Sequence, residues 1–219
     1  MTQDSEKKGR NAMQKEIQTK DDFKKVMYSD PEEYNGKFSN EIAERENKEI
    51  QRILAKHIRP DSIVHDIGCG TGLGRELLGD TFTGDYYGID NIIESVVHCR
   101  VNLKGIFLHE TAEKFIEHEK VVNPLFIFSA DYMDIETLEA YIQKTDEVFI
   151  AVHYNEPYLS QTSYYQDQEE TFHELHPPHM QLEKLSLFER YGGDTRRLLD
   201  EDYYYVTVIK GNNYGRNKI

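Results

Sequence analysis

Short apolar runs alternate with helical segments through the middle of the chain, and this alternation constrains the fold more than any other feature. Each run is rich in β-branched or aromatic residues and is bounded by turn residues, as buried strands are. The five runs are Ser62–Ile67, Tyr86–Asp90, Gly105–His109, Leu125–Ser129 and Glu147–Val152. Strands that are apolar throughout and separated by helices form parallel sheets covered on both faces. The sequence therefore predicts a doubly wound α/β fold.

The regions on either side of this alternation have a different composition. Residues 1–20 are almost entirely polar, and we expect a mobile tail there because such a segment buries too little apolar surface to become ordered. Helical spacing of apolar residues predicts N-terminal helices in 21–58, the second over Phe38–Ile58. We expect these helices to form a lid; the alternative is that both simply pack on the main domain. The main domain is predicted at 59–219. Within it, residues 156–190 are rich in Tyr, Gln, Glu and His, and we expect this insertion to form part of a substrate site.

Composition narrows the class of protein. The 219 residues include 26 basic and 40 acidic side chains, a formal net charge of −14. Because such a surface repels a phosphate backbone, a nucleic-acid partner is disfavoured. Two cysteines, Cys69 and Cys99, are too few for a disulfide framework or a zinc ribbon. No window approaches the roughly 18 apolar residues of a membrane span, and the start lacks the apolar core of a signal peptide. We expect a cytoplasmic protein with no membrane partner.

A glycine-rich loop, Asp66-Ile67-Gly68-Cys69-Gly70-Thr71-Gly72, follows the first predicted strand and precedes a predicted helix over Leu73–Leu78. Doubly wound sheets bind ligands at such a turn, and an acid at the end of the second strand, here Asp90, holds ribose hydroxyls. The dinucleotide fingerprint requires glycine where Leu73 stands, and the phosphate loop requires a lysine that is absent. Asp66, two residues before Gly68, favours a cationic or amino-bearing ligand over a pyrophosphate.

These residues resemble the first motif of the class I S-adenosylmethionine-dependent methyltransferases. Ser62–Gly72 is similar to the family's V-L-D-I-G-C-G-T-G, with His65 in place of the usual Leu. The resemblance continues in register to about residue 152. It implies a Rossmann-like, mostly parallel seven-stranded sheet of order 3-2-1-4-5-7-6, with helices on both faces and Tyr203–Ile209 as the antiparallel last strand. It also implies S-adenosyl-L-methionine as the cofactor and methyl transfer as the activity.

The resemblance also implies roles for individual residues. The Gly68–Gly70 turn would lie under the methionine and ribose of the cofactor, with Asp66 near its amino group, and Asp90 would accept from both ribose hydroxyls. Glu110 would accept from the adenine amino group, because His109–Glu113 is similar to the family's G-D-A-E motif, with Glu for Asp and His for Gly. The candidate cofactor-binding residues are Asp66, Gly68, Cys69, Gly70, Asp90, Asn91, Ile92, Glu110, Thr111, Ala112 and Ser129.

A second register of the motifs is open. Phe128-Ser129-Ala130-Asp131 could be the third-strand motif, which would make Asn155-Glu156-Pro157-Tyr158 a degenerate N-P-P-Y motif of amino-group methyltransferases. The spacing favours the first register, because a step between strands through one helix takes about 20–30 residues, and Glu110 lies 110 − 90 = 20 residues after Asp90.

Candidates for the acceptor side lie at the ends of the fourth and fifth strands. A general base is needed only when the nucleophile arrives protonated, and imidazole suits that task at neutral pH. His153 and Tyr154 are the candidate catalytic residues; the alternative is that His153 caps the strand or lines the pocket without proton transfer. The candidate substrate and lid residues are Tyr28, Tyr34, Asp131, Tyr132 and Glu156.

Three histidines lie at spacings of three in the insertion: His173, His176 and His179. Because Pro177-Pro178 ends any helix before His179, we expect no metal site. A site made of His173 and His176 with Glu174 or Glu170 is the alternative.

The functional prediction is transfer of a methyl group from S-adenosylmethionine to a small molecule by in-line displacement, a reaction that relies on positioning and desolvation. The acidic charge and the single domain favour a small acceptor over a macromolecule. A methyltransferase acting on RNA or protein and a non-catalytic S-adenosylmethionine-binding protein are the alternatives, since fold alone does not set function.

Overall fold

A computed structural model describes residues 41–153, 178–192, 196–197 and 204–210. The predicted tail at 1–20, the candidate lid residues Tyr28 and Tyr34, and Tyr154 and Glu156 of the acceptor side lie outside the described residues.

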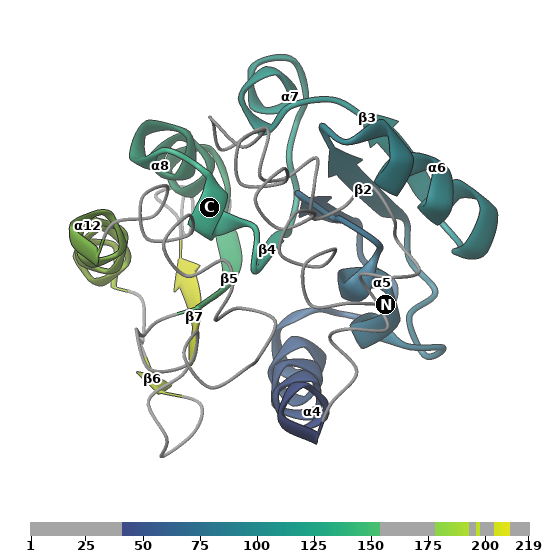
Figure 1. Cartoon of the computed structure of the whole chain (residues 1–219), viewed down its shortest axis with the longest axis horizontal. Coiled ribbons are helices and arrows are strands. Elements are labelled where there is room, and N and C mark those ends of the chain that lie inside the picture. Colours follow the sequence, from purple (N-terminus) through teal and green to yellow (C-terminus); the bar gives the residue numbers. More distant parts are fainter. Residues whose placement is uncertain (1–40, 154–177, 193–195, 198–203, 211–219) are drawn as a thin grey trace, which may run out of the picture.

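Strands and helices alternate along the described chain as the sequence predicts (Figure 1). The strands are β1 (Val64–Ile67), β2 (Tyr86–Asp90), β3 (Ile106–His109), β4 (Pro124–Ile127), β5 (Glu147–His153), β6 (Arg196–Arg197) and β7 (Tyr204–Lys210). The helices are α4 (Glu41–His57), α5 (Leu73–Leu78), α6 (Ile93–Asn102), α7 (Ala112–His118), the 3₁₀ turn η1 (Ala130–Tyr132), α8 (Ile135–Lys144) and α12 (Pro178–Arg190).

The described strands form one sheet in the order β3-β2-β1-β4-β5-β7-β6. Neighbouring strands from β3 to β5 are parallel. β7 runs antiparallel to both β5 and β6. The predicted α/β class is therefore confirmed, with a mostly parallel sheet and an antiparallel end. β7 begins and ends one residue later than the predicted last strand, because its pairing with β5 extends to Glu147↔Lys210.

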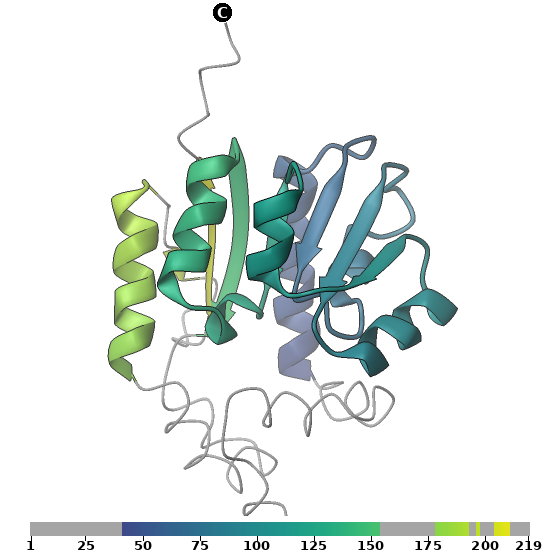
Figure 2. The ribbon, with the colours of Figure 1, turned by 90° about the horizontal axis from the view of Figure 1, so that it is seen from above.

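Both faces of the sheet are packed, and β5 shows why. Val148, Ile150 and Val152 belong to one buried cluster, which includes side chains of α7, α8 and α12. The intervening Phe149 and Ala151 belong to a second cluster with side chains of α4, α5 and α6. Successive residues of a strand point to opposite faces, so an all-apolar strand fits this position. Figure 2 shows α7, α8 and α12 on one side of the sheet and α4 on the other.

Helix α4 belongs to the core of the domain. Its Ile50 and Leu54 are buried against the sheet, together with Ile58 just beyond the helix. The second predicted N-terminal helix is thus packed on the main domain from Glu41 onward, and the rest of the predicted lid at 21–58 lies outside the described residues. No helix among the described residues combines the length and apolar character needed to cross a membrane.

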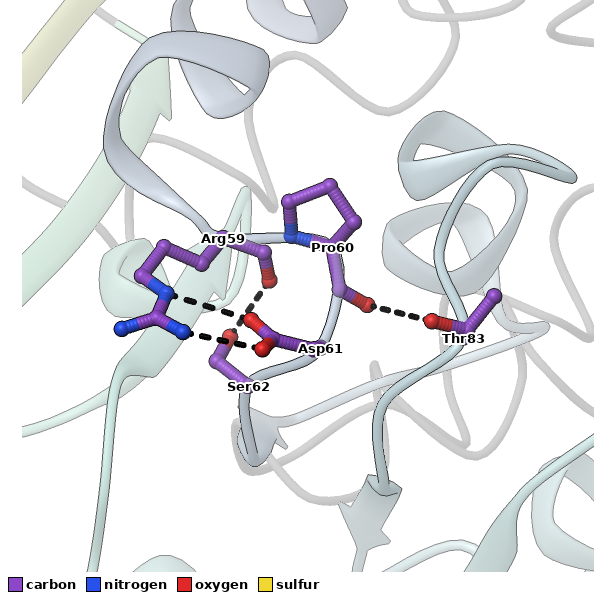
Figure 3. A network of polar contacts seen from close by, with 5 residues as sticks. All are labelled: Arg59, Pro60, Asp61, Ser62 and Thr83. Atoms are coloured by element: carbon purple, nitrogen blue, oxygen red, sulfur yellow. Dashed lines mark hydrogen bonds and ion pairs between the residues drawn. The ribbon is translucent and has the colours of Figure 1, made fainter.

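A network of polar contacts fixes the chain where it enters β1 (Figure 3). The guanidinium of Arg59 donates two hydrogen bonds to the carboxylate of Asp61, and the Ser62 hydroxyl donates to the carbonyl of Arg59 at 2.8 Å. The hydroxyl of Thr83 donates to the Pro60 carbonyl, which also accepts from two backbone N–H groups. The starts of β1 and β2 are therefore tied together at the end of the sheet opposite the glycine loop.

His65, the one departure from the family's first motif, joins β1 to the chain before β4. Pro124 stands opposite His65 in the sheet and has no N–H to donate. The Nδ1 of His65 lies 2.9 Å from the carbonyl oxygen and 3.1 Å from the amide nitrogen of Val122. Its ring stacks on Tyr87 with centroids 5.1 Å apart. Burial lowers the pKa of His65, so the neutral imidazole is the favoured form.

Candidate functional site

The glycine loop turns sharply between β1 and α5. Gly68 and Gly70 have φ of 71° and 51°, a region that residues with a Cβ rarely adopt. A Cβ on Gly68 would lie 2.6 Å from the Cβ of Ser129, so the close approach of these two segments requires glycine. The amides of Gly68 and Cys69 both donate to the carbonyl of Ile89, which holds the turn against the end of β2.

Asp90 organises the loops around it. Its Oδ2 accepts from the amide of Gly70 and its Oδ1 from the amide of Ile92, each at 2.8 Å. Its carbonyl accepts from the amide of Glu110. The carboxylate at the end of β2 is therefore fixed by the glycine loop on one side and by the start of α6 on the other.

These loops enclose a pocket at the carboxyl ends of β1 to β4, the edge where open α/β sheets bind ligands. It holds about 820 Å³ of empty space, part of it open to solvent. The predicted cofactor-binding residues that line it are Gly68, Cys69, Gly70, Asp90, Asn91, Ile92, Glu110, Thr111, Ala112 and Ser129. Tyr132, a predicted substrate contact, also lines it.

Several lining residues were not predicted: Thr71, Leu73, Ile89, Glu113, Ile127, Phe128 and Met133. Most of these residues directly flank a predicted residue, so extending each predicted motif by one position would have included that majority. Met133 follows the 3₁₀ turn after β4, and no sequence motif marked it.

The charged side chains that line the pocket are all acidic. Asp90, Glu110 and Glu113 line it, and no lysine or arginine is among the described lining residues. Because two negative groups within a few ångströms repel each other, this lining opposes a polyphosphate and favours a ligand that carries positive charge.

Asp66 departs from the prediction, because the structure does not bring it into the pocket. Its side chain is 1% exposed, and its Oδ2 accepts a hydrogen bond from the Tyr86 hydroxyl. A Cβ on Gly74 would lie 2.1 Å from that oxygen, which places the carboxylate beneath helix α5. Burial raises the pKa of Asp66 to about 7, with a further contribution from Asp90. The sequence did not reveal that the Asp66 side chain points to this face of β1.

The two cysteines of the chain meet behind the glycine loop. The carbonyl of Gly70 accepts from both thiols, at 3.3 Å from Cys99 and at 3.9 Å from Cys69. The neighbouring Cys99 thiol and burial raise the pKa of Cys69. Cys69 therefore stays a protonated thiol, and both cysteine side chains pack the glycine loop on α6.

The segment after β4 forms the wall of the pocket opposite Asp90. Phe128 has a φ of 58°, so β4 ends two residues before the predicted strand end at Ser129. The Ser129 hydroxyl donates to the Ile67 carbonyl at 2.5 Å. Asp131, a predicted substrate contact, is 4% exposed and is not among the lining residues. Asp131 belongs to η1, within this segment, and its side chain is buried.

The strand pairing decides between the two motif registers. β3 lies beside β2, with His109 opposite Asp90, so Glu110 follows the third strand. Asp131 follows β4, which pairs with β1 and β5. The second register, with Asp131 in the third-strand motif, is therefore wrong.

The catalytic candidate His153 ends β5, where its backbone pairs with Tyr204. His173 and His176 lie outside the described residues, and His179 is described only as part of the α12 backbone. Within the described ranges, no group of three or more His, Cys, Asp or Glu side chains is placed to hold a metal ion.

Comparisons with known proteins support the fold. No protein-family model matches the sequence, and no curated protein sequence matches it. Solved structures do match. Magnesium protoporphyrin IX methyltransferase (ChlM) from Synechocystis PCC 6803, solved with bound SAH, matches with a TM-score of 0.54 over 78% of this chain and 88% of its own, at 11% identity. This chain has the fold of the class I S-adenosylmethionine-dependent methyltransferases.

Two further structures have this methyltransferase fold. The plantazolicin methyltransferase BamL, in complex with a triazolic desmethylPZN analog and SAH, matches with a TM-score of 0.57 over 94% of this chain and 99% of its own, at 17% identity. The methyltransferase domain of bacterial CtHen1 matches with a TM-score of 0.52 over 75% of this chain and 96% of its own, also at 17% identity.

Proposed function

We propose that this protein is an S-adenosylmethionine-dependent methyltransferase that transfers a methyl group to a small molecule by in-line displacement. The observation that carries the proposal is the pocket at the carboxyl ends of β1 to β4, in which acidic side chains surround a glycine turn that is fixed to Asp90. Solved proteins of the same fold hold SAH, which supports S-adenosyl-L-methionine as the cofactor.

The residues present fit this cofactor. A carboxylate at the end of β2, here Asp90, is the acceptor that a ribose diol requires. Ile92 is 6% exposed and lines the pocket beside Asp90, which gives an apolar surface for the adenine ring. Glu110 would accept from the adenine amino group. Because Gly68 and Gly70 have no side chains, a ligand can approach the backbone of this turn closely.

When bound, S-adenosylmethionine supplies a methyl group on a positively charged sulfur, which is already an electrophile. The task of the chain is to hold and orient the cofactor, to offset its positive charge, and to exclude water. Asp90, Glu110 and Glu113 supply negative charge around the pocket. We propose His153 and Tyr154 as the acid–base groups, with Tyr28, Tyr34 and Glu156 on the acceptor side.

A small acceptor is supported by two observations. The net charge of −14 opposes binding to a nucleic-acid backbone. Among the solved structures of the same fold are methyltransferases of magnesium protoporphyrin IX and of plantazolicin.

The test is incubation with methyl-labelled S-adenosylmethionine and an extract of the source cells, followed by separation of small molecules, RNA and protein. We expect label in the small-molecule fraction with the wild-type protein, and much less with Asp90→Ala at the same cofactor concentration. Label confined to RNA or protein would contradict the small acceptor, and label equal in both samples would contradict the assigned site.

A further inference from the structure

A buried lysine supports the wall of the pocket from outside the motifs. Lys184 lies in α12 and is 4% exposed. Its ammonium donates to the carbonyl oxygen of Ala130 at 2.9 Å and to that of Asp131 at 2.7 Å. Helix α12 is held in this place by Leu187 and Phe188, which are fully buried in the core cluster with α8.

The two carbonyls that Lys184 binds belong to η1, directly between residues that line the pocket. Ser129 precedes Ala130, and Tyr132 and Met133 follow Asp131; all three line the pocket. Any shift of the η1 backbone would therefore move the side chains that face a bound ligand.

The backbone of this wall has a conformation that needs support. Phe128 has a φ of 58°, which a side chain with a Cβ disfavours, and such residues persist only where their surroundings fix them. The amide of Phe128 donates to the Ala151 carbonyl at 2.8 Å, and the Ser129 hydroxyl donates to Ile67. These contacts come from β5 and β1 and hold the start of the segment. The contacts from Lys184 hold its far end.

Burying a lysine only to fill space in the core is energetically unfavourable. Removing an ammonium from water is unfavourable unless hydrogen bonds replace the water, and apolar residues of similar size fill buried space as well or better. Bonds from a charged donor to carbonyl oxygens are stronger than bonds between neutral groups, so they restrain the backbone that supplies the oxygens.

We propose that Lys184 is a positioning residue that fixes the Phe128–Met133 wall of the cofactor and acceptor pocket. The assignment of that wall to a methyltransferase site rests on the proposed function. The restraint itself does not, because it is a property of the protein without any ligand.

Hydrogen exchange measured by mass spectrometry tests the restraint in the ligand-free protein. The amides of Tyr132 and Met133 donate within the turn to Ser129 and Ala130, so they report on its opening. Lys184→Met removes the ammonium and keeps an unbranched chain. Because a hydrogen bond to a charged group is lost, exchange in a peptide covering 128–134 should be about tenfold faster or more. A peptide covering 64–70 should exchange as in the wild type.

Arg190→Met is the matched control, because it removes a cation from the same helix and the Arg190 side chain is 62% exposed. This variant should leave the exchange rates of both peptides unchanged. Lys184→Arg keeps a buried donor and should restore slow exchange in 128–134, at least in part. If Lys184→Met does not fold, Lys184→Gln takes its place, because its shorter amide cannot reach both carbonyls. Unchanged exchange in 128–134, or equally faster exchange in both peptides, would overturn the proposal.

Calorimetric titration with S-adenosylhomocysteine then tests the link to the site. Weaker binding by Lys184→Met, with recovery in Lys184→Arg, supports the positioning role in ligand binding. Faster exchange in 128–134 with unchanged affinity would overturn that role. If the wild type binds no S-adenosylhomocysteine, the proposed function fails, while the exchange result still decides the restraint.

Discussion

The hydroxyl of Tyr86 donates a 2.5 Å hydrogen bond to the carboxyl group of Asp66, and both side chains are buried. The burial raises the pKa of Asp66 from its ordinary value to about 7. In the unfolded chain this carboxyl ionises near its ordinary pKa, so between those two values the folded protein binds more protons than the unfolded one. The contribution of Asp66 to stability is therefore complete below about pH 4 and is lost as the pH rises through about 7.

Asp66→Asn should remove this pH dependence, because the amide does not ionise and its oxygen still accepts from Tyr86. The free energy of unfolding of the variant, relative to wild type, should rise between pH 4 and pH 8 by at most about 4 kcal/mol. Urea denaturation at several pH values measures it. Asp61→Asn is the control, since Asp61 is exposed and its Arg59 partner lowers its pKa. A difference between Asp66→Asn and wild type that stays flat with pH would contradict the account.

His65 should make stability depend on pH in the opposite direction, with stability falling as the pH drops. Burial lowers the pKa of His65. Below the ordinary histidine pKa, the unfolded chain therefore binds a proton that the folded chain does not bind, and stability falls as the pH drops through that range. His65→Asn keeps a polar atom near the position of Nδ1, within reach of Val122, and does not titrate. The variant should lose less stability than wild type between pH 7 and pH 5 in the same denaturation experiment. An equal loss in both proteins would show that His65 does not carry this dependence.

Alanine substitutions at Gly68 and Gly192 separate two destabilising effects of an added side chain, backbone strain and overpacking. Both have positive φ, 71° and 73°, but a Cβ on Gly68 would meet Ser129 whereas one on Gly192 meets nothing within 4 Å. Gly192→Ala should cost about 1–2 kcal/mol of stability from backbone strain alone. Gly68→Ala should add about 1–3 kcal/mol from overpacking and weaken ligand binding, because the turn must shift away from Ser129. Thermal denaturation of the two variants compares them, and equal costs would argue against close packing of the two segments.

Asp90→Ala should weaken binding of S-adenosylmethionine by about 1.5–3 kcal/mol, the value of a hydrogen bond to a charged group. Part of this loss would come through the loop, because Asp90 also accepts from the amides of Gly70 and Ile92. Glu94→Ala, at an exposed acid in the first turn of α6, changes charge by the same amount outside the pocket and should bind as wild type. Equal affinities in Asp90→Ala and Glu94→Ala would mean that the ribose site lies elsewhere.

Much of the fold was predictable because its signals are local. Tyr86–Asp90 is a strand with those bounds, and Leu73–Leu78 is a helix that ends at Gly79, since turn residues delimit both. The order of the motifs along the chain then placed Gly70, Asp90 and Glu110 at one edge of the sheet, because parallel strands bring their carboxyl ends together.

The contacts that the sequence did not reveal depend on side-chain direction or on distant segments. Asp66 was expected in the pocket, but its carboxylate lies beneath α5 with Tyr86, and no local pattern decides to which face a strand residue points. Phe128 was expected inside a strand, but its left-handed backbone ends β4. Lys184 lies in a region of weak periodicity and meets Ala130 across more than 50 residues of chain, which no short motif encodes.

The central claim is that the acidic pocket binds S-adenosylmethionine, and calorimetric titration of the wild-type protein tests it most directly. S-adenosylmethionine and S-adenosylhomocysteine should each bind at one site per chain, while ATP, which shares the adenosine but carries a polyphosphate, should bind far more weakly because Asp90, Glu110 and Glu113 repel it. Absence of heat with both S-adenosyl compounds, or equal affinity for ATP, would contradict the account.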